Sequence, residues 1–585
     1  MLYPIQNEVR SVMELNGIWD VSIERQSVSG SNMPLTDCFK VYVPGSINDQ
    51  VRDEKIRNHV GDFWYRREVY VPNYLFSQRI VLRFGSVTQR ADVYVNGKQV
   101  FSHIGGFTPF EFELNKYIRV GKNELEVKVS NILDNTTLPV GYHLKTEDKE
   151  EVIPMFDFYN YCGIHRSVVL YTTNDTYIKD IDINYQIKEN YAMVLPKVEI
   201  VGDYDNIIYE ILDDTENVVS ASDDIHNLLV DSPRLWQPMN AYLYTLRVKV
   251  FSNGRLVDIY SEKFGIRTIE IKNNQLLING KSYYLKGFGR HEDFPVLGKG
   301  HNGAVTVLDH NLMKWMGANS YRTSHYPYAE EDLRLADEEG FLVIDEAPGV
   351  GLYSRFNFDV SKNNADSSTW SWVQTQEHHK QVIQELVTRD KNHPSVIAWA
   401  IANEPAGHHP GACEYFKPLV ELTKSLDYEH RPVVVPNIVN ATPELDEITK
   451  LVDIICLNRY YGWYIDHGNL NESLEKLKKE IETWHEKYPD KPIMFSEFGV
   501  DTVPGLHSLY ENPYSEEYQR DYYQAYFDVF DEYSYVIGEH LWNFADFVTG
   551  RNLRRIDGNL KGIFTRDRRP KSVAYDIRKR WTSMD

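Results

Sequence analysis

Cysteine is scarce in this sequence, and its few cysteines do not form the pattern of a cross-linked or metal-binding protein. The 585 residues include only Cys38, Cys162, Cys413 and Cys456, which are widely scattered. They form no CxxC pair, and no histidine stands near them at zinc-ligand spacing. This scarcity argues against a disulfide framework and a structural zinc site, and it favours a reducing compartment.

Long hydrophobic runs are also missing. No stretch approaches the roughly 18 consecutive apolar residues that would indicate a membrane-spanning helix. The first residues, MLYPIQNEVRSVMELNG, lack the basic segment and continuous apolar core of a signal peptide. We therefore expect a cytoplasmic protein that does not bind membranes.

Positive charge is in deficit. Lys and Arg number 63 against 85 Asp and Glu, which gives a formal net charge of -22. Such a surface repels phosphate backbones and anionic lipid. Nucleic acid is therefore excluded as an expected partner.

The first half of the chain shows the pattern of two β-sandwiches. Apolar and polar residues alternate in segments such as 63–71 and 79–87, which are separated by Gly, Asn and Pro. The pair Asn96-Gly97 stands between two such segments and predicts a hairpin. We expect a jelly-roll β-sandwich over residues 1–175 and a smaller, immunoglobulin-like β-sandwich over residues 176–271.

From about residue 272 the pattern changes to short buried strands that alternate with amphipathic helices. Eight candidate strands occupy residues 282–289, 318–324, 341–347, 396–404, 432–437, 452–460, 492–499 and 536–546. This number of strands over this length is typical of a (β/α)₈ TIM barrel with insertions. We therefore expect a barrel over residues 272–585, and function at the C-terminal ends of its strands.

Two of these strands end in a glutamate after an almost wholly apolar run. Glu404 follows VIAWAIAN at the expected fourth strand, and Glu497 follows PIMFS at the seventh. A single such glutamate is usually a structural or surface residue. Two glutamates at the same face of a barrel are typical of glycoside hydrolases. In these enzymes one carboxylate attacks the anomeric carbon, and the other acts as acid and then as base.

These contexts resemble the glycoside hydrolase family that includes β-galactosidases, β-mannosidases and β-glucuronidases. Asn403-Glu404-Pro405 and Ser496-Glu497-Phe498-Gly499 match the family's acid/base and nucleophile motifs, and residues 160–166, 287–293, 321–328 and 340–347 are also similar to it. The order of jelly roll, immunoglobulin-like sandwich and barrel extends the resemblance over the whole chain. It implies that Glu404 is the acid/base and Glu497 the nucleophile of a retaining enzyme.

Within the family the resemblance is closest to the β-glucuronidases. Residues 558–565 resemble their Asn-x-Lys motif, which implies that Asn559 and Lys561 bind the C6 carboxylate of a glucuronide. A sugar carboxylate that enters a site with two acidic side chains needs a cation, which Lys561 and the nearby Arg555 can supply. The alternative for this segment is a basic, solvated loop.

The resemblance also implies a set of further sugar-binding residues. Each has an ordinary structural alternative, such as an exposed loop acid for Asp157 or a packing aromatic for Trp542. The implied set is Asp157, His325, Asn403, Tyr460, Tyr464 and Trp542.

No metal or other cofactor is expected, although some β-galactosidases of the family use metal ions. His291-Glu292-Asp293 and His408-His409 have neither HExxH spacing nor a third ligand that we can identify. The segment 350–374 shows no clear periodicity, and so long a loop after the third strand is expected to be functional and to lie over the site.

Three hypotheses remain open at this stage. The first is a retaining β-glucuronidase with a small-molecule glucuronide substrate; the second is a sibling glycosidase, such as a galactosidase or mannosidase. The third is a catalytically inactive carbohydrate-binding protein on the same scaffold. A sibling glycosidase would not explain the presence of Asn559 and Lys561. An inactive binding protein would not explain the two glutamates at the strand ends. A homo-oligomer, either a tetramer or a dimer, is what the family implies.

Overall fold

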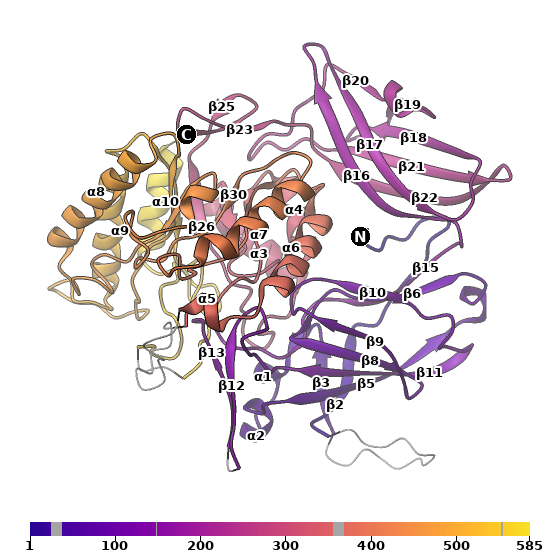
Figure 1. Cartoon of the computed structure of the whole chain (residues 1–585), viewed down its shortest axis with the longest axis horizontal. Coiled ribbons are helices and arrows are strands. Elements are labelled where there is room, and N and C mark those ends of the chain that lie inside the picture. The colour runs from indigo at the N-terminus through magenta and orange to yellow at the C-terminus, as the bar shows by residue number, and fades with distance from the viewer. Residues whose placement is uncertain (25–37, 148, 355–367, 552–553, 585) are drawn as a thin grey trace.

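A computed structural model describes residues 1–24, 38–147, 149–354, 368–551 and 554–584. Figure 1 shows two β-sandwiches beside a barrel that is surrounded by helices. Each of the three has a buried hydrophobic cluster of its own. The expected combination of a jelly roll, an immunoglobulin-like sandwich and a TIM barrel is confirmed as the fold class.

The first sandwich places a six-stranded sheet, β3-β2-β5-β11-β8-β9, against a four-stranded sheet, β1-β15-β6-β10. Alternate residues of the strands point inward and form the core, which is why the sequence alternates. Asn96 and Gly97 have φ of 50° and 82° and join β8 to β9, so the predicted hairpin is confirmed. The bounds are β1 Val12–Glu14, β2 Gly17–Ser22, β3 Phe39–Val43, β5 Asp62–Val71, β6 Arg79–Phe84, β8 Arg90–Val95, β9 Lys98–Ile104, β10 Phe110–Glu113, β11 Gly121–Ser130 and β15 Val168–Thr173.

A hairpin between β11 and β15 of this sandwich has its base against the barrel and its tip pointing away from it (Figure 1). Its strands are β12 (Gly141–Lys145) and β13 (Glu150–Pro154), and the chain continues into the loop that contains Asp157. Backbone bonds from Met155 N to Val140 O (3.1 Å) and from Val140 N to Val350 O (3.0 Å) attach the base of the hairpin to the barrel. The first sandwich thereby contributes side chains to the barrel mouth.

The second sandwich consists of two antiparallel sheets, β16-β17-β20 and β19-β18-β21-β22. Its bounds are β16 Tyr177–Ile187, β17 Tyr191–Val201, β18 Asn206–Leu212, β19 Val218–Ser222, β20 Leu229–Asp231, β21 Tyr244–Ser252 and β22 Arg255–Phe264. A small sheet follows, formed by β23 (Ile269–Lys272), β24 (Gln275–Ile278) and β25 (Lys281–Ser282). Leu276 and Ile278 of this sheet pack with residues at the beginnings of the barrel strands, so the sheet covers the N-terminal end of the barrel.

The barrel contains eight parallel strands in the order β30-β29-β28-β27-β26-β33-β32-β31. A parallel bridge between Asn437 and Leu457 joins the two ends of this order. All eight expected strands are present: β26 Leu285–Gly289, β27 Ser320–Arg322, β28 Leu342–Glu346, β29 Val396–Ala400, β30 Val433–Val434, β31 Ile455–Asn458, β32 Ile493–Glu497 and β33 Val536–Leu541. Several are shorter than their apolar runs.

Helices surround the strands, as Figure 1 shows. They are α3 Gly303–Met316, α4 Glu330–Glu339, α5 Thr369–Trp372, α6 Gln376–Asp390, α7 Ala412–Leu426, α8 Leu470–Lys487, α9 Glu516–Phe530 and α10 Val573–Ser583. Of the segment 350–374, which we expect to lie over the site, residues 355–367 fall outside the described residues. No helix among the described residues combines the length and the apolar composition needed to cross a bilayer.

Candidate active site

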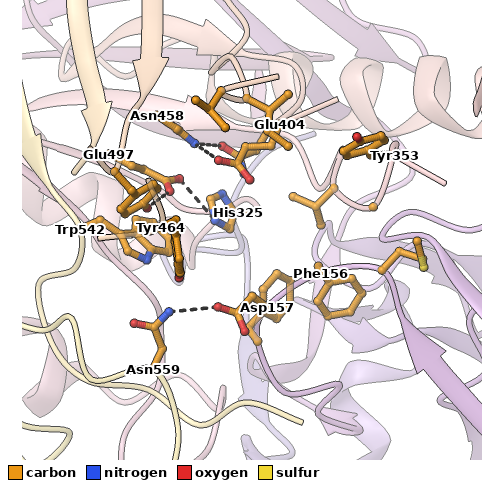
Figure 2. Close-up of a pocket in the computed structure, with 18 of the residues that line it drawn as sticks. Phe156, Asp157, His325, Tyr353, Glu404, Asn458, Tyr464, Glu497, Trp542 and Asn559 are labelled. Atoms are coloured by element: carbon orange, nitrogen blue, oxygen red, sulfur yellow. Dashed lines mark hydrogen bonds and ion pairs between the residues drawn. The ribbon is translucent and has the colours of Figure 1, made fainter. Parts of the chain in front are cut away.

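A cavity of about 430 Å³ opens at the C-terminal ends of the barrel strands. Its wall combines residues from the barrel with the loop after β13 of the first sandwich. Every site residue predicted from the sequence lines this cavity except Lys561. Figure 2 shows Glu404 and Glu497 in the cavity, with Asp157 and Asn559 at a separate corner.

Glu404 enters the cavity from the turn that follows β29. Its backbone has a φ of 49°, in the left-handed region, and its N–H donates to Pro436 O at 2.9 Å. Non-glycine residues adopt this conformation mainly where the surrounding structure enforces it, as at functional sites. Asn458 Nδ2 donates to Glu404 Oε1 at 3.1 Å and to Asn403 Oδ1 at 3.1 Å, so one amide orients both residues.

Glu497 is the last residue of β32 and is almost completely buried. It accepts hydrogen bonds from Arg322 Nη2 at 2.5 Å and from Tyr460 Oη at 2.6 Å. His325 Nε2 lies 3.7 Å from the same carboxylate. A guanidinium and a hydroxyl therefore hold the Glu497 carboxyl group in place.

The two glutamates have different electrostatic environments. Burial, and secondarily the nearby charge of Glu497, raises the pKa of Glu404 to about 8, against an opposing hydrogen bond from Asn458. Glu404 is therefore largely protonated at neutral pH, next to a carboxylate that is paired with Arg322. A proton donor beside an ionised carboxylate is the arrangement that glycosidases require.

An aromatic floor lies beside Glu497. The rings of His325 and Trp542 stack with centroids 5.0 Å apart and an angle of 23° between their planes. His325 Nδ1 is 2.7 Å from Glu346 Oε1, which fixes the orientation of the imidazole. The stack presents a flat, partly apolar surface to the cavity, as a sugar ring requires.

The corner away from the two glutamates contains Asp157, Arg555 and Asn559. The Arg555 guanidinium donates from Nε to Asp157 Oδ1 at 3.2 Å and also from Nη2 to Oδ2, and Asn559 Nδ2 donates to Asp157 Oδ2 at 3.1 Å. Asn559 N and Phe547 O are 2.9 Å apart, which anchors the segment after β33 to the chain beside it. Arg555 and Asn559 thus supply donors of the kind that bind carboxylates, and in this structure they pair with the carboxylate of Asp157.

Lys561 lies behind this corner and not on the cavity wall. Its side chain is fully buried, and Nζ donates to Tyr464 Oη at 2.8 Å and to Asp501 Oδ2. Burial, and then the nearby Arg555, lowers the pKa of Lys561 to about 8, so the ammonium is largely charged at neutral pH. Although burial alone would raise the pKa of Asp501, Lys561 and Arg555 hold it below its ordinary value.

Three further residues were not singled out from the sequence. Arg322 bridges Glu346 and Glu497, Asn458 bridges Asn403 and Glu404, and Asp501 bridges Lys561 and Arg555. Arg322 and Asn458 are the last residues of β27 and β31, so their position at strand ends was an available signal. Asp501 follows β32 by four residues, and only the fold reveals its partners.

Among the residues described, no group of three or more His, Cys, Asp or Glu side chains is arranged to hold a metal ion. The cavity wall itself contains the two glutamates and, at its other corner, Asp157, Arg555 and Asn559.

Family models match nearly the whole chain in three consecutive parts. Residues 12–174 match the sugar binding domain of glycosyl hydrolases family 2, residues 164–267 match a further model of that family, and residues 269–585 match its TIM barrel domain.

Individual relatives are similar over the full length. A β-glucuronidase from Streptococcus agalactiae is 45% identical over 593 residues, which cover 100% of this chain and 98% of the relative. The human β-glucuronidase is 38% identical over 618 residues, covering 99% of this chain and 92% of the relative. A structure of the Ruminococcus gnavus β-glucuronidase in complex with D-glucuronic acid has a TM-score of 0.92 and 40% identity, with 99% of each chain covered. A β-glucuronidase from an uncultured Clostridium species gives a TM-score of 0.92 and 43% identity over 100% of both chains.

Proposed function

The chain belongs to glycosyl hydrolases family 2, and on that premise we propose that it is a retaining β-glucuronidase. It hydrolyses β-D-glucuronides to glucuronic acid and an aglycone through a covalent glycosyl-enzyme. The observation that carries this proposal is the presence, in one cavity, of two glutamates in contrasting environments and a separate corner that contains the donors Arg555 and Asn559, which here pair with Asp157. Full-length similarity to β-glucuronidases supports it.

Glu497 is the nucleophile of the proposed mechanism. Its carboxylate attacks the anomeric carbon while the bond to the leaving oxygen breaks, which gives a glycosyl ester. Hydrogen bonds from Arg322 and Tyr460 orient the carboxylate before the attack. In a retaining site the two carboxyl groups are about 5 to 5.5 Å apart, which leaves no room for a water behind the sugar.

Glu404 is the acid and then the base. With a pKa raised to about 8 it carries the proton that the leaving oxygen needs at neutral pH. Once Glu497 is esterified its negative charge is gone, so the pKa of Glu404 falls. The ionised Glu404 then removes a proton from the water that hydrolyses the ester.

The corner selects the sugar. Arg555 and Asn559 at the wall bind the C6 carboxylate, and Lys561 supplies positive charge one hydrogen bond behind the wall, through Tyr464. An anion buried without such partners costs several kcal/mol, so a site with these donors favours a glucuronide over a neutral sugar. Asp157, His325, Asn403, Tyr460 and Trp542 complete the proposed sugar contacts.

Turnover of chromogenic substrates tests this function directly. The 4-nitrophenyl β-glucuronide is expected to be cleaved with a kcat/KM at least roughly 10²-fold above that of the matched galactoside and mannoside. The Glu497→Gln variant, which keeps the shape of the side chain, is expected to remain folded and to be inactive. Preferential cleavage of the galactoside or mannoside would favour a sibling glycosidase, and no cleavage by the folded wild type would favour a carbohydrate-binding protein.

Three further proposals concern the whole protein. We propose domain limits of 1–175, 176–271 and 272–585, close to the limits of the three family matches. We propose a cytoplasmic, reducing environment because all four cysteines are free. We also propose a homo-oligomer, dimer or tetramer, which light scattering on the purified protein tests.

A further inference from the structure

Lys299 is a buried lysine in the loop between β26 and α3, and its side chain does not line the active-site cavity. The residue is 3% exposed. Its ammonium lies against three aromatic rings: Nζ is 3.8 Å from the ring centre of Tyr326, 4.5 Å from that of Phe158 and 4.9 Å from that of Phe107. We call Lys299 and these three rings the lysine cage.

The lysine cage joins the first sandwich to the barrel. Phe107 lies between β9 and β10 and Phe158 in the loop after β13, whereas Tyr326 follows β27 of the barrel. The rings also contact each other: Phe107 stacks on Tyr326 with centroids 4.6 Å apart, and Phe158 meets Tyr326 edge-on at 5.9 Å. An ammonium is attracted to the faces of aromatic rings, most strongly where water is excluded. A charged Lys299 therefore draws together rings from two domains.

Two rings of the lysine cage are chain neighbours of residues at the proposed sugar site. Phe158 directly follows Asp157, and its ring stacks on that of His325 with centroids 6.2 Å apart. Tyr326 directly follows His325. Asp157 and His325 both line the cavity, as Figure 2 shows. A shift of either ring therefore displaces a side chain that the proposed function places against the sugar.

The ammonium of Lys299 titrates near neutral pH. Burial, the main cause, lowers its pKa to about 7. The carboxylates of Glu292 and Asp293 oppose this shift, and the nearby cation of Arg166 adds to it. Arg166 and Glu292 also pair with each other, from Nη2 to Oε2 at 2.5 Å. Lys299 is therefore mostly charged below pH about 7 and mostly neutral above it.

Other titratable side chains face the lysine cage. Burial holds the pKa of the His165 and His291 imidazoles well below the ordinary value, so both are neutral at neutral pH. Burial also raises the pKa of the Tyr326 hydroxyl well above its ordinary value, so the phenol keeps its proton. The pKa of Asp293 is raised by burial as well, although its ion pair with Arg566 opposes the rise.

We infer that Lys299 is a positioning residue: through the lysine cage, its charge holds Asp157 and His325 in the arrangement that binds the sugar. The inference rests on the proposed function, which supplies the sugar contacts of Asp157 and His325. When the ammonium loses its proton, its attraction to the ring faces is lost, and the loop after β13 is held less firmly. Lys299 is therefore expected to strengthen glucuronide binding below pH about 7 and to lose this effect as pH rises.

Binding of methyl 1-thio-β-D-glucuronide to the wild type and to Lys299→Met tests the inference. The sulfur linkage resists hydrolysis, so the inhibition constant reports binding alone, and methionine replaces the lysine stem without its charge. At pH about 6 the variant is expected to bind roughly tenfold more weakly than the wild type, and at pH about 8.5 the two should agree within roughly threefold. Glu404 and Lys561 titrate in both proteins, so the ratio of the two constants isolates Lys299.

Two further measurements separate positioning from support of the fold. An apolar side chain in place of a buried ammonium is neutral or stabilising, so Lys299→Met is expected to melt no lower than the wild type although it binds more weakly. Lys299→Arg keeps its charge at both pH values and can stack on the ring faces, so at pH about 8.5 it is expected to bind more tightly than the wild type.

Lys286→Met is the matched control. Lys286 is another buried lysine of the barrel; its Nζ donates to Trp581 O at 2.9 Å, and it does not line the cavity. This variant is expected to keep the wild-type affinity at both pH values.

The outcomes separate the inference from the proposed function. Equal affinity of the wild type and Lys299→Met at pH about 6, or an affinity ratio that is the same at both pH values, overturns the inference while glucuronide turnover leaves the proposed function intact. If Lys299→Met does not fold, the comparison with Lys299→Arg decides, and equal affinity at pH about 8.5 overturns the inference. Failure of the wild type to bind the thioglucuronide at either pH overturns the proposed function itself.

Discussion

At the residue scale, different neighbours give the identical side chains of Glu404 and Glu497 different chemical roles. Glu497 accepts hydrogen bonds from a guanidinium and a phenol hydroxyl, whereas Glu404 accepts one from an amide. Burial therefore raises the pKa of Glu404 without a compensating cation in direct contact. The two roles follow from this difference.

Removal of Glu404 is expected to affect substrates according to their leaving groups. Glu404→Ala lacks the proton donor, so kcat/KM should fall roughly 10²-fold or more for alkyl glucuronides and much less for activated aryl glucuronides. Added azide should restore part of the rate on the aryl substrates, because it attacks the glycosyl-enzyme without a base. Steady-state kinetics on both substrate types check this, and equal losses would contradict the acid/base assignment.

The raised pKa of Glu404 also costs stability. Its pKa is about 8 in the folded protein, against an ordinary value of 4.5 for a glutamate side chain. Between these two pH values the folded protein holds a proton on Glu404 that the unfolded chain has released. The free energy of unfolding therefore falls as pH rises through this range. The Glu404→Gln variant does not titrate, so it should be more stable than the wild type at pH about 8, by roughly 4 kcal/mol, and should lose most of this advantage at pH about 5. Urea denaturation at the two pH values measures this, and an advantage that does not depend on pH would contradict it.

The two glutamates were predictable from the sequence because each ends an apolar strand in a distinctive local context. The position of Lys561 was not, because its burial depends on the packing of Tyr464 and Asp501 around Nζ. Local sequence indicates which residues can carry charge. It does not indicate which carboxylate takes each hydrogen bond.

At the element scale, the barrel gathers strand ends that are distant in the sequence. Arg322 at the end of β27 contacts Glu346 at the end of β28 and Glu497 at the end of β32. Although burial opposes a charged Arg322, the two carboxylates raise its pKa. One cation thus holds three strands in register beneath the site.

Replacement of Arg322 by Met is expected to leave two buried carboxylates without their shared cation. The free energy of unfolding should fall by about 3 kcal/mol or more, and activity should be largely lost. Arg322→Lys should recover only part of the stability and part of the activity. A single ammonium cannot contact Glu346 and Glu497 through two separate nitrogens as the guanidinium does. Chemical denaturation and kinetics on the two variants test this, and full function in Arg322→Met would contradict the role assigned to Arg322.

The elements themselves were largely predictable, because the change from alternating to helical periodicity marks the beginning of the barrel. Helix α7 (Ala412–Leu426) is a helix that the sequence pattern did not single out. It contains Pro418, whose missing N–H and fixed φ disfavour a helix interior. Packing of Phe416 and Leu419 into the barrel core offsets this penalty.

At the scale of the whole molecule, the first sandwich and the barrel share buried ion pairs. Arg83 of β6 pairs with Glu330 of α4, 247 residues away, and Arg166 pairs with Glu292. These contacts fix the sandwich that contributes Asp157 and Phe156 to the cavity. Pairings at such separations cannot be inferred from local patterns, which is why the sequence predicts the domains but not how they are joined.

The Arg83→Met variant tests this coupling. It leaves Glu330 buried without its partner, so we expect a loss of about 3 kcal/mol and a lower melting temperature. Activity at 25 °C should be retained, because Arg83 does not line the active-site cavity. Calorimetry and a glucuronidase assay measure the two effects, and an unchanged melting temperature would show that the contact does not join the domains.

Selection of a glucuronide by the charged corner is the central claim, and the ratio of two specificity constants tests it most directly. The measurement is kcat/KM for 4-nitrophenyl β-glucuronide and for the matched glucoside, on the wild type and on Lys561→Ala. Loss of the buried ammonium should lower the glucuronide value by roughly 10²-fold or more and lower the glucoside value far less, because only the glucuronide carries the C6 anion. Equal proportional losses on both substrates would show that Lys561 is structural and would contradict the account.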